Sequence, residues 1–181
     1  MNIKRIKSLN NKKVAIDNNV LIDLQEMSAA LNTNFMKLLN HLFNDIFIPI
    51  PILEDEIISS LNGLNYMEGI FSTEEGYRLY NKISNQKHAK MLSDYDIHLV
   101  VLAEEKNLLV ISNDKPIRNI CNDYNIEITG TIGIIVSLFE NDIITNKLLE
   151  TAFQFLFSSK SSCYLDNDLK DKIKQEYSLD L

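Results

Sequence analysis

Short apolar runs of strand length alternate with longer segments of helical periodicity along most of this chain. Four runs are typical of strands: Lys12 to Ile16, Ile46 to Ile48, Leu108 to Ser112 and Ile126 to Thr129. The other periodic segments predict helices over Val20 to Leu31, Phe35 to Phe43, Ile52 to Leu61, Glu74 to Ile83, Ser93 to Asn107, Lys115 to Tyr124, Gly130 to Leu138, Thr145 to Phe157 and Asp168 to Tyr177. Strands that alternate with helices form βαβ units. We therefore expect an α/β fold of three layers, α/β/α, with a short central parallel sheet covered by helices.

The length of 181 residues suits one domain with its own core, and the sequence contains no internal repeat. Residues 62–90 hold three of the five glycines and are the most loop-like part of the chain. We expect a principal unit over residues 1–157, with a basic N-terminal arm at 1–13 and a variable loop and helix region at 62–90. Residues 158–181 are expected to form a C-terminal loop and helix packed on the same domain.

The net charge of −7 is unusual for a protein that binds nucleic acid, because phosphate backbones favour basic surfaces. Two bound divalent cations would bring this charge to about −3 and make their site attractive to phosphate. Positive charge is concentrated before Asp17, at Lys4, Arg5, Lys7, Lys12 and Lys13. A solvated terminus and an RNA-contacting strip are both open explanations of this arm.

Three features bear on the cellular setting. No apolar run approaches the roughly 20 residues of a membrane-spanning helix. The first residues lack the apolar stretch of a secretory signal. The two cysteines, Cys121 and Cys163, match no zinc-binding spacing, and we expect reduced thiols in a cytoplasmic protein.

Aspartates follow two of the predicted strands. Asp17 comes directly after Val14–Ala15–Ile16, and Asp114 comes two residues after Ser112. In parallel α/β sheets, ligands bind beyond the carboxyl ends of the strands. Each aspartate also has a structural explanation, because Asp is favoured at the N-terminus of the helix that follows. Taken singly, neither position decides between a site and a cap.

A third aspartate, Asp96, lies near the start of the helix predicted over residues 93–107. Ser93 and Asp96 have the spacing of a capping box, which is one explanation. Asp96 also lines up with Val100 and Ala103, so it heads the stripe of that helix expected to be buried, where a carboxylate favours a cation. Asp94 lies off the stripe and suits the first turn through the helix dipole.

The fourth acid comes from the run Glu54–Asp55–Glu56. Glu56 follows Leu53 by three residues and precedes Ile57, which places it beside an apolar face near the start of a helix. Asp55 is the alternative, and Glu54 is expected to face solvent.

Structural caps alone would require four unrelated acids to converge on one edge of one sheet. A set of oxygen ligands without Cys or His suits hard cations such as Mg²⁺ or Mn²⁺. Two such ions roughly 3.5–4 Å apart would stabilise both the attacking and the leaving oxygen of phosphodiester hydrolysis. The acids therefore predict metal-dependent phosphodiester chemistry.

Four segments in chain order resemble motifs of PIN domains. Residues 14–24 resemble the opening motif, an apolar strand followed by Asp-x-Asn and an aliphatic helix start. Residues 92–96, followed by Ala103, resemble the third acidic motif, and residues 109–115 resemble the fourth, in which Ser112 precedes the acid by two. Residues 126–134 are similar to the strand-to-helix step of many bacterial members. In addition, residues 163–173 resemble the final helix of toxin-type members.

The resemblance implies a metal-dependent endoribonuclease, often the VapC-like toxin of a toxin–antitoxin pair. Asp17, Glu56, Asp96 and Asp114 would then form the catalytic, metal-binding quartet, with Asp55 as the alternative to Glu56. Asn19, Ser112 and Asp94 would support the quartet. The implied partners are an RNA substrate, an antitoxin protein and a second copy of the chain, with no membrane. The implied products carry a 5′-phosphate and a 3′-hydroxyl.

Two other functions remain open within the same resemblance: a catalytically silent PIN-like scaffold or regulatory module, and a DNA-directed nuclease. The choice between RNA and DNA does not follow from the metal chemistry itself. A haloacid-dehalogenase phosphatase is disfavoured because Asn19 stands where that class needs a second Asp. The glycine-rich motifs of nucleotide-binding loops are absent from the sequence.

Overall fold

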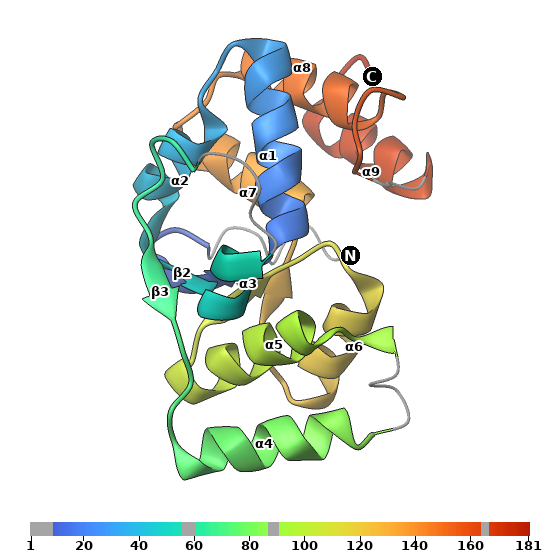
Figure 1. Ribbon diagram of the computed structural model, residues 1–181. Coiled ribbons are helices and arrows are strands. Elements are labelled where there is room, and N and C mark those ends of the chain that lie inside the picture. Colours follow the sequence, from blue (N-terminus) through green and yellow to red (C-terminus); the bar gives the residue numbers. More distant parts are fainter. Residues whose placement is uncertain (1–8, 56–60, 87–90, 164–166) are drawn as a thin grey trace.

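The computed structural model describes residues 9–55, 61–86, 91–163 and 167–181 (Figure 1). The strands are β1 (Lys12–Ile16), β2 (Phe43–Pro49), β3 (Met67–Gly69), β4 (Leu109–Ile111) and β5 (Ile128–Thr129). The helices are α1 (Asn18–Leu31), α2 (Phe35–Leu42), α3 (Ile50–Asp55), α4 (Glu74–Ser84), α5 (Asp94–Lys106), α6 (Lys115–Asp123), α7 (Thr131–Glu140), α8 (Asn146–Leu156) and α9 (Asn167–Tyr177).

The strands form one parallel sheet in the order β3-β2-β1-β4-β5. The central strand is β1, in which Val14 pairs with Ile46 of β2 on one side and with Leu109 of β4 on the other. Neighbouring strands are joined through helices, as parallel pairing requires. The predicted three-layer α/β fold is therefore confirmed.

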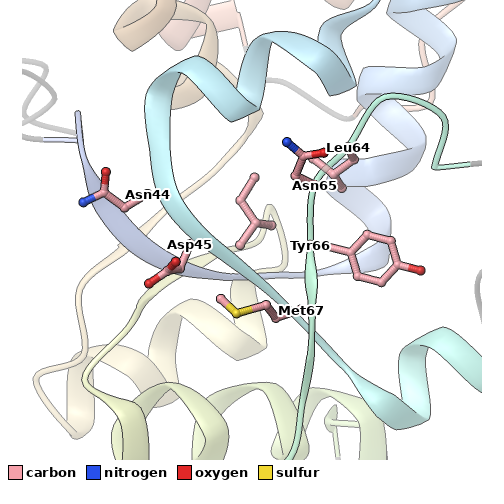
Figure 2. Close-up of a pocket in the computed structure, with 7 residues that line it drawn as sticks. Asn44, Asp45, Leu64, Asn65, Tyr66 and Met67 are labelled. Atoms are coloured by element: carbon pink, nitrogen blue, oxygen red, sulfur yellow. The ribbon is translucent and has the colours of Figure 1, made fainter.

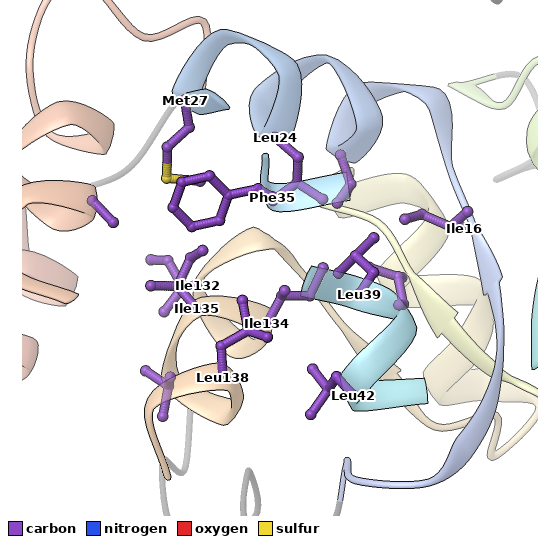
Figure 3. Close-up of a cluster of buried hydrophobic side chains, with 14 of the residues drawn as sticks. Ile16, Leu24, Met27, Phe35, Leu39, Leu42, Ile132, Ile134, Ile135 and Leu138 are labelled. Atoms are coloured by element: carbon purple, nitrogen blue, oxygen red, sulfur yellow. The ribbon is translucent and has the colours of Figure 1, made fainter. Parts of the chain in front are cut away.

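Helices cover both faces of the sheet (Figure 1). Val14 and Ile16 of β1 point into a core shared with α1, α2, α7, α8 and α9, whereas Ala15 points into a core shared with α4, α5 and α6. Figure 3 shows the first core, where Leu24 of α1, Phe35 of α2 and other apolar side chains meet α7. Burial on both faces explains why β4 and the second half of β1 are continuously apolar rather than alternating.

The predicted helices and strands are present within a few residues of their expected bounds, with two differences. The helix predicted over residues 52–61 is described only to Asp55, because residues 56–60 lie outside the described part of the chain. The edge strand β3 was not predicted. It has only three residues, pairs only with β2 and lies in the glycine-containing region expected to be loop-like.

The C-terminal residues pack on the same core as the rest of the chain. Ile173 of α9 and Leu179 are buried there, as are Phe153 and Leu156 of α8. The face of α8 that carries these two residues therefore contributes to the core. Both cysteines are buried and free. No helix among the described residues is long and apolar enough to cross a membrane.

Candidate functional site

The parallel sheet brings the predicted acidic positions to one edge. Asp17 follows the last residue of β1, and Ser112 follows the last residue of the adjacent strand β4. The strand order reverses between β1 and β4, and such a switch point is where ligands bind in open parallel sheets. The helix α5 leads back into β4, so its first turn, which contains Asp96, belongs to the same edge. The fold thus assembles residues that are up to 97 positions apart in sequence.

Asp17 is a buried carboxylate held by two side-chain donors, with 5% of its surface exposed. Its Oδ2 atom accepts hydrogen bonds from Asn19 Nδ2 at 2.6 Å and from Ser112 Oγ at 2.7 Å. Asp17 occupies the N-cap position of α1 but makes no side-chain capping hydrogen bond. The cap explanation of this residue is therefore not supported, and Asn19 and Ser112 are the residues that hold its side chain.

Ser112 connects Asp17 to Asp114. The Ser112 hydroxyl, which donates to Asp17, accepts a hydrogen bond from the backbone amide of Asp114 at 3.1 Å. The carbonyl oxygen of Ser112 accepts a bond from Arg118 Nη2 at 3.1 Å. Because Ser112 is completely buried, this geometry is insulated from solvent. One hydroxyl thus fixes the relative positions of two predicted ligands.

Asp114 and Asp96 are electrostatically coupled. Partial burial raises the pKa of Asp114, and the negative charge of Asp96 raises it further, while the backbone amide of Ile117 opposes both effects. A cation bound near Asp114 and Asp96 would offset this repulsion of the Asp114 charge. The coupling supports the prediction that these acids share one site.

Asp96 also forms the capping box that its spacing allows. Ser93 N donates to Asp96 Oδ2 at 2.7 Å, and Asp96 N donates to Ser93 Oγ at 3.2 Å. Asp96 is half-buried and heads a stripe in which Val100 and Ala103 are buried. The structural explanation is therefore confirmed, with one carboxylate oxygen engaged in the cap, and the ligand role of Asp96 stays a prediction.

Asp94 lies on another face of α5. Its Oδ1 atom accepts a hydrogen bond from Tyr80 Oη of α4 at 2.7 Å. Its carbonyl oxygen is 2.9 Å from His98 Nδ1, and the His98 ring packs against both Phe71 and Tyr80. The side chain of Asp94 is thus joined to α4 rather than to the Asp17–Ser112 pair.

The acidic run that begins at Glu54 and Asp55 is the second of the four acidic segments in chain order, and it approaches the site through α3. Asp55, the last residue of α3, accepts a hydrogen bond from Tyr95 Oη at 3.2 Å. Tyr95 directly precedes Asp96, so the second and third acidic segments are neighbours in space. Glu56, the preferred ligand of this segment, lies outside the described residues.

The described residues fit a hard divalent cation in chemistry but supply only part of a coordination sphere. Asp17, Asp96 and Asp114 offer oxygen ligands of the type that Mg²⁺ and Mn²⁺ prefer. Within the described ranges, however, no three His, Cys, Asp or Glu side chains are close enough together to hold a metal ion. A metal site built on these aspartates would therefore need a further ligand, for which the run that begins at Glu54 and Asp55 is the predicted source.

A comparison with protein families identifies the chain. The family model DUF3368, described as a PIN domain, matches residues 13–178, which include every described residue of the site. The chain belongs to the PIN-domain family. PIN domains are generally nucleases that use divalent metals, and their substrates are nucleic acids. No curated protein matches the chain.

Sequence reasoning missed Asp23, which the PIN fold buries beside the site. Only 3% of Asp23 is exposed, and its Oδ2 atom accepts hydrogen bonds from Asn113 and Thr131. A signal was present, because Asp23 shares the helical stripe of Val20 and Met27, both of which are buried. Asp23, like Asp96, is an acid on a helical stripe that the sequence predicts to be buried.

Two cavities of this PIN domain lie at the other edge of the sheet. Figure 2 shows one of about 450 Å³, lined by the start of β2 and by Leu64 to Met67. The other, of about 550 Å³, is lined in part by Lys12, Lys13 and Glu127. These are the amino ends of the strands, opposite the carboxyl edge that carries Asp17, so neither cavity belongs to the acidic site.

The basic arm predicted over residues 1–13 is only partly described, since residues 1–8 lie outside the described part of the chain. Lys12 and Lys13 belong to β1 and form ion pairs with Glu127 and Asp45, respectively. These two lysines therefore neutralise acids at the amino edge of the sheet, away from the carboxyl edge.

Proposed function

We propose that this PIN domain is a metal-dependent endoribonuclease. Its catalytic and metal-binding residues are Asp17, Glu56, Asp96 and Asp114, and Mg²⁺ or Mn²⁺ is the metal. The observation that carries the proposal is the link between Asp17 and Asp114 through the Ser112 hydroxyl, at the switch point of the sheet. In addition, the negative charge of Asp96 acts on Asp114.

Two side chains around Asp17 orient its carboxylate. Asn19 and Ser112 both donate to its Oδ2 atom. They fix the direction of the carboxylate because each comes from a different part of the fold. Asn19 belongs to the first turn of α1, and Ser112 directly follows the last residue of β4.

When bound, the divalent metal would activate water and stabilise the charge that develops on the phosphodiester. The chain's own task is to hold the carboxylates that bind the metal, and no side chain needs to serve as a nucleophile. By analogy with the family, the products would carry a 5′-phosphate and a 3′-hydroxyl.

The choice of RNA rests on the resemblance of the motifs and of the C-terminal helix to toxin-type PIN domains. We extend the proposal on the same basis to a cytoplasmic toxin with an antitoxin protein as partner, and to a homodimer. DNA cleavage and a silent scaffold are the competing functions.

The deciding experiment measures cleavage of fluorescent RNA and DNA oligonucleotides of the same sequence, with EDTA and after addition of excess Mg²⁺ or Mn²⁺. The proposal expects RNA cleavage that EDTA abolishes and metal restores. Cleavage of the DNA strand alone would instead identify a DNA nuclease. A protein that binds RNA without cutting it in the presence of metal would be a binding module.

The toxin role needs a separate test in cells. Expression of the chain without an antitoxin should arrest growth, and Asp17→Asn should relieve the arrest. The matched control is Asp123→Asn, which changes an exposed acid at the opposite end of α6 from Asp114. Growth that is equally unaffected by wild type and by Asp17→Asn would contradict the toxin role.

A further inference from the structure

Asp23 lies at a junction of four segments of the chain. Its Oδ2 atom accepts hydrogen bonds from Asn113 Nδ2 at 2.6 Å and from Thr131 Oγ1 at 2.7 Å. Its Oδ1 atom accepts a longer bond from Ser162 Oγ at 3.4 Å. Asp23 thus joins α1 to the β4–α6 turn, to the first residue of α7 and to the segment after α8.

The partner of greatest interest is Asn113, because it lies between Ser112 and Asp114. Besides its bond to Asp23, Asn113 Nδ2 donates to Thr131 Oγ1 at 2.8 Å, and Asn113 Oδ1 accepts from Thr131 N at 3.0 Å. Both polar atoms of this amide are engaged. The side chain therefore anchors the turn to α1 and α7.

A second route connects Asn113 to Asp17. The backbone amide of Asn113 donates to Asn19 Oδ1 at 3.4 Å, and Asn19 Nδ2 donates to Asp17 Oδ2. A displacement of Asn113 would consequently disturb Asp17 through Asn19, as well as Asp114 through the backbone.

The burial of Asp23 is energetically costly, and burial raises the pKa of its carboxyl group. The bonds from Thr131 and Asn113 oppose that effect. A buried carboxyl is tolerated only where donors satisfy it, and a satisfied polar network makes the surrounding geometry rigid. The network here surrounds the turn that carries Asp114.

We propose that Asp23 is a positioning residue, which acts with Asn113 and Thr131 to fix the turn bearing Ser112 and Asp114. Asp23 is not itself a metal ligand, since its oxygens are directed to Asn113, Thr131 and Ser162. The importance of this turn for metal binding rests on the proposed nuclease function. The role of Asp23 in fixing the position of the turn is independent of that function.

The test uses Asp23→Asn and Thr131→Val in the full chain. The first variant keeps the size of the side chain and removes its charge. The second keeps the branched shape of Thr131 and removes the hydroxyl that donates to Asp23. The control is Ile46→Val, a buried substitution in the middle of β2, which removes one methylene from the core.

Two quantities are measured well below the melting temperature of each variant. The first is amide hydrogen exchange at Asn113, Asp114 and Thr131, which we expect to accelerate at least about tenfold in Asp23→Asn and Thr131→Val but not in the control. The second is Mn²⁺ affinity, which we expect to weaken about 10- to 100-fold in both test variants, as for other residues that orient metal ligands.

The outcomes separate the two proposals. Unchanged exchange at Asn113 and Asp114 in both test variants would overturn the positioning role, as would exchange that accelerates equally in Ile46→Val. Accelerated exchange in a protein whose wild type neither binds Mn²⁺ nor cleaves RNA would retain the positioning role and reject the proposed nuclease. If Asp23→Asn does not fold, Thr131→Val decides alone by the same criteria.

Discussion

The Ser112 hydroxyl donates a hydrogen bond of 2.7 Å to Asp17 Oδ2 across the boundary between β4 and β1. Ser112 is fully buried and Asp17 is almost so, which means that water cannot replace the bond if it is lost. The same hydroxyl accepts from the amide of Asp114. A single atom thus determines how the ends of two adjacent strands present their carboxylates.

Ser112→Ala should reduce RNA cleavage about 10- to 100-fold, because the substitution releases Asp17 from one of its two orienting donors. The free energy of unfolding should fall by about 1–3 kcal/mol, since buried groups lose a partner. Initial rates at saturating Mn²⁺ and a thermal melt measure the two effects. The control is Ser137→Ala in α7, another fully buried serine. Equal losses of activity in the two variants would argue against a specific role of Ser112.

Asp17→Asn should leave the fold intact and lower cleavage by about 100-fold or more. The amide oxygen can still accept from Asn19 and Ser112, but a neutral side chain binds a divalent cation far less well. Circular dichroism tests whether the fold is intact, and single-turnover kinetics measure the loss of cleavage. An unfolded variant would show that the carboxylate is structural, and full activity would remove Asp17 from the site.

Asp114→Asn should be more stable than the wild type at neutral pH in the absence of metal, although it should be inactive. Burial and Asp96 raise the pKa of Asp114 above its ordinary value, so the ionised form is disfavoured in the folded protein. Between the ordinary and the raised pKa the folded state holds more protons than the unfolded state, and stability therefore falls as pH rises. This loss of folding stability is complete above the raised pKa.

Thermal melts of the wild type and of Asp114→Asn in EDTA, from acidic to neutral pH, test the direction of this change in stability. The advantage of Asp114→Asn should be absent below the ordinary pKa of aspartate and should grow to a plateau as pH increases. Addition of Mn²⁺ should raise the melting temperature of the wild type more than that of the variant. A variant that is less stable than the wild type throughout would contradict the prediction.

Gly130→Ala should displace Asn113 and reduce cleavage about tenfold. A Cβ atom at Gly130 would collide with Asn113 Oδ1 and lie 3.3 Å from the carbonyl oxygen of Ser112. The backbone of Gly130 is extended, with φ of −139°, so alanine is not strained by conformation and the contact alone causes the effect.

The matched control is Gly76→Ala in α4, where the new Cβ would meet the side chain of Glu105. Glu105 lies in the last turn of α5, at the opposite end of that helix from Asp96, so cleavage should stay near the wild-type rate. Similar activity in Gly130→Ala and Gly76→Ala would show that the position of Asn113 is unimportant.

The sequence predicted the fold well because its cues were local. Apolar strands, helical periodicity and caps such as Ser93 all act within a few residues. The edge strand β3 was not predicted, because it forms through pairing with β2 rather than through a pattern in its own sequence. Its exposed Met67 and Glu68 carry no burial pattern that could reveal it.

The site was predictable in part for the same reason. Asp17, Asp96 and Asp114 were predicted from their places at strand ends and helix starts. The capping box of Ser93 and Asp96 was visible in the spacing of the two residues. Only the structure shows that the box forms and that the charge of Asp96 also acts on Asp114. The bond from Asn113 to Asp23 joins residues 90 positions apart, and no local pattern encodes such a contact.

The second acidic segment yields the last prediction, which compares Glu56→Gln with Asp55→Asn. We expect Glu56→Gln to reduce cleavage about 100-fold or more, because we assign Glu56 as the fourth ligand. Asp55 is exposed and accepts a bond from Tyr95, so its loss should have a smaller effect, within about tenfold. Tyr95→Phe, which removes only that bond, is the matched control for Asp55→Asn. Cleavage and Mn²⁺ affinity are measured together, and a larger loss of both in Asp55→Asn than in Glu56→Gln would transfer the ligand role to Asp55.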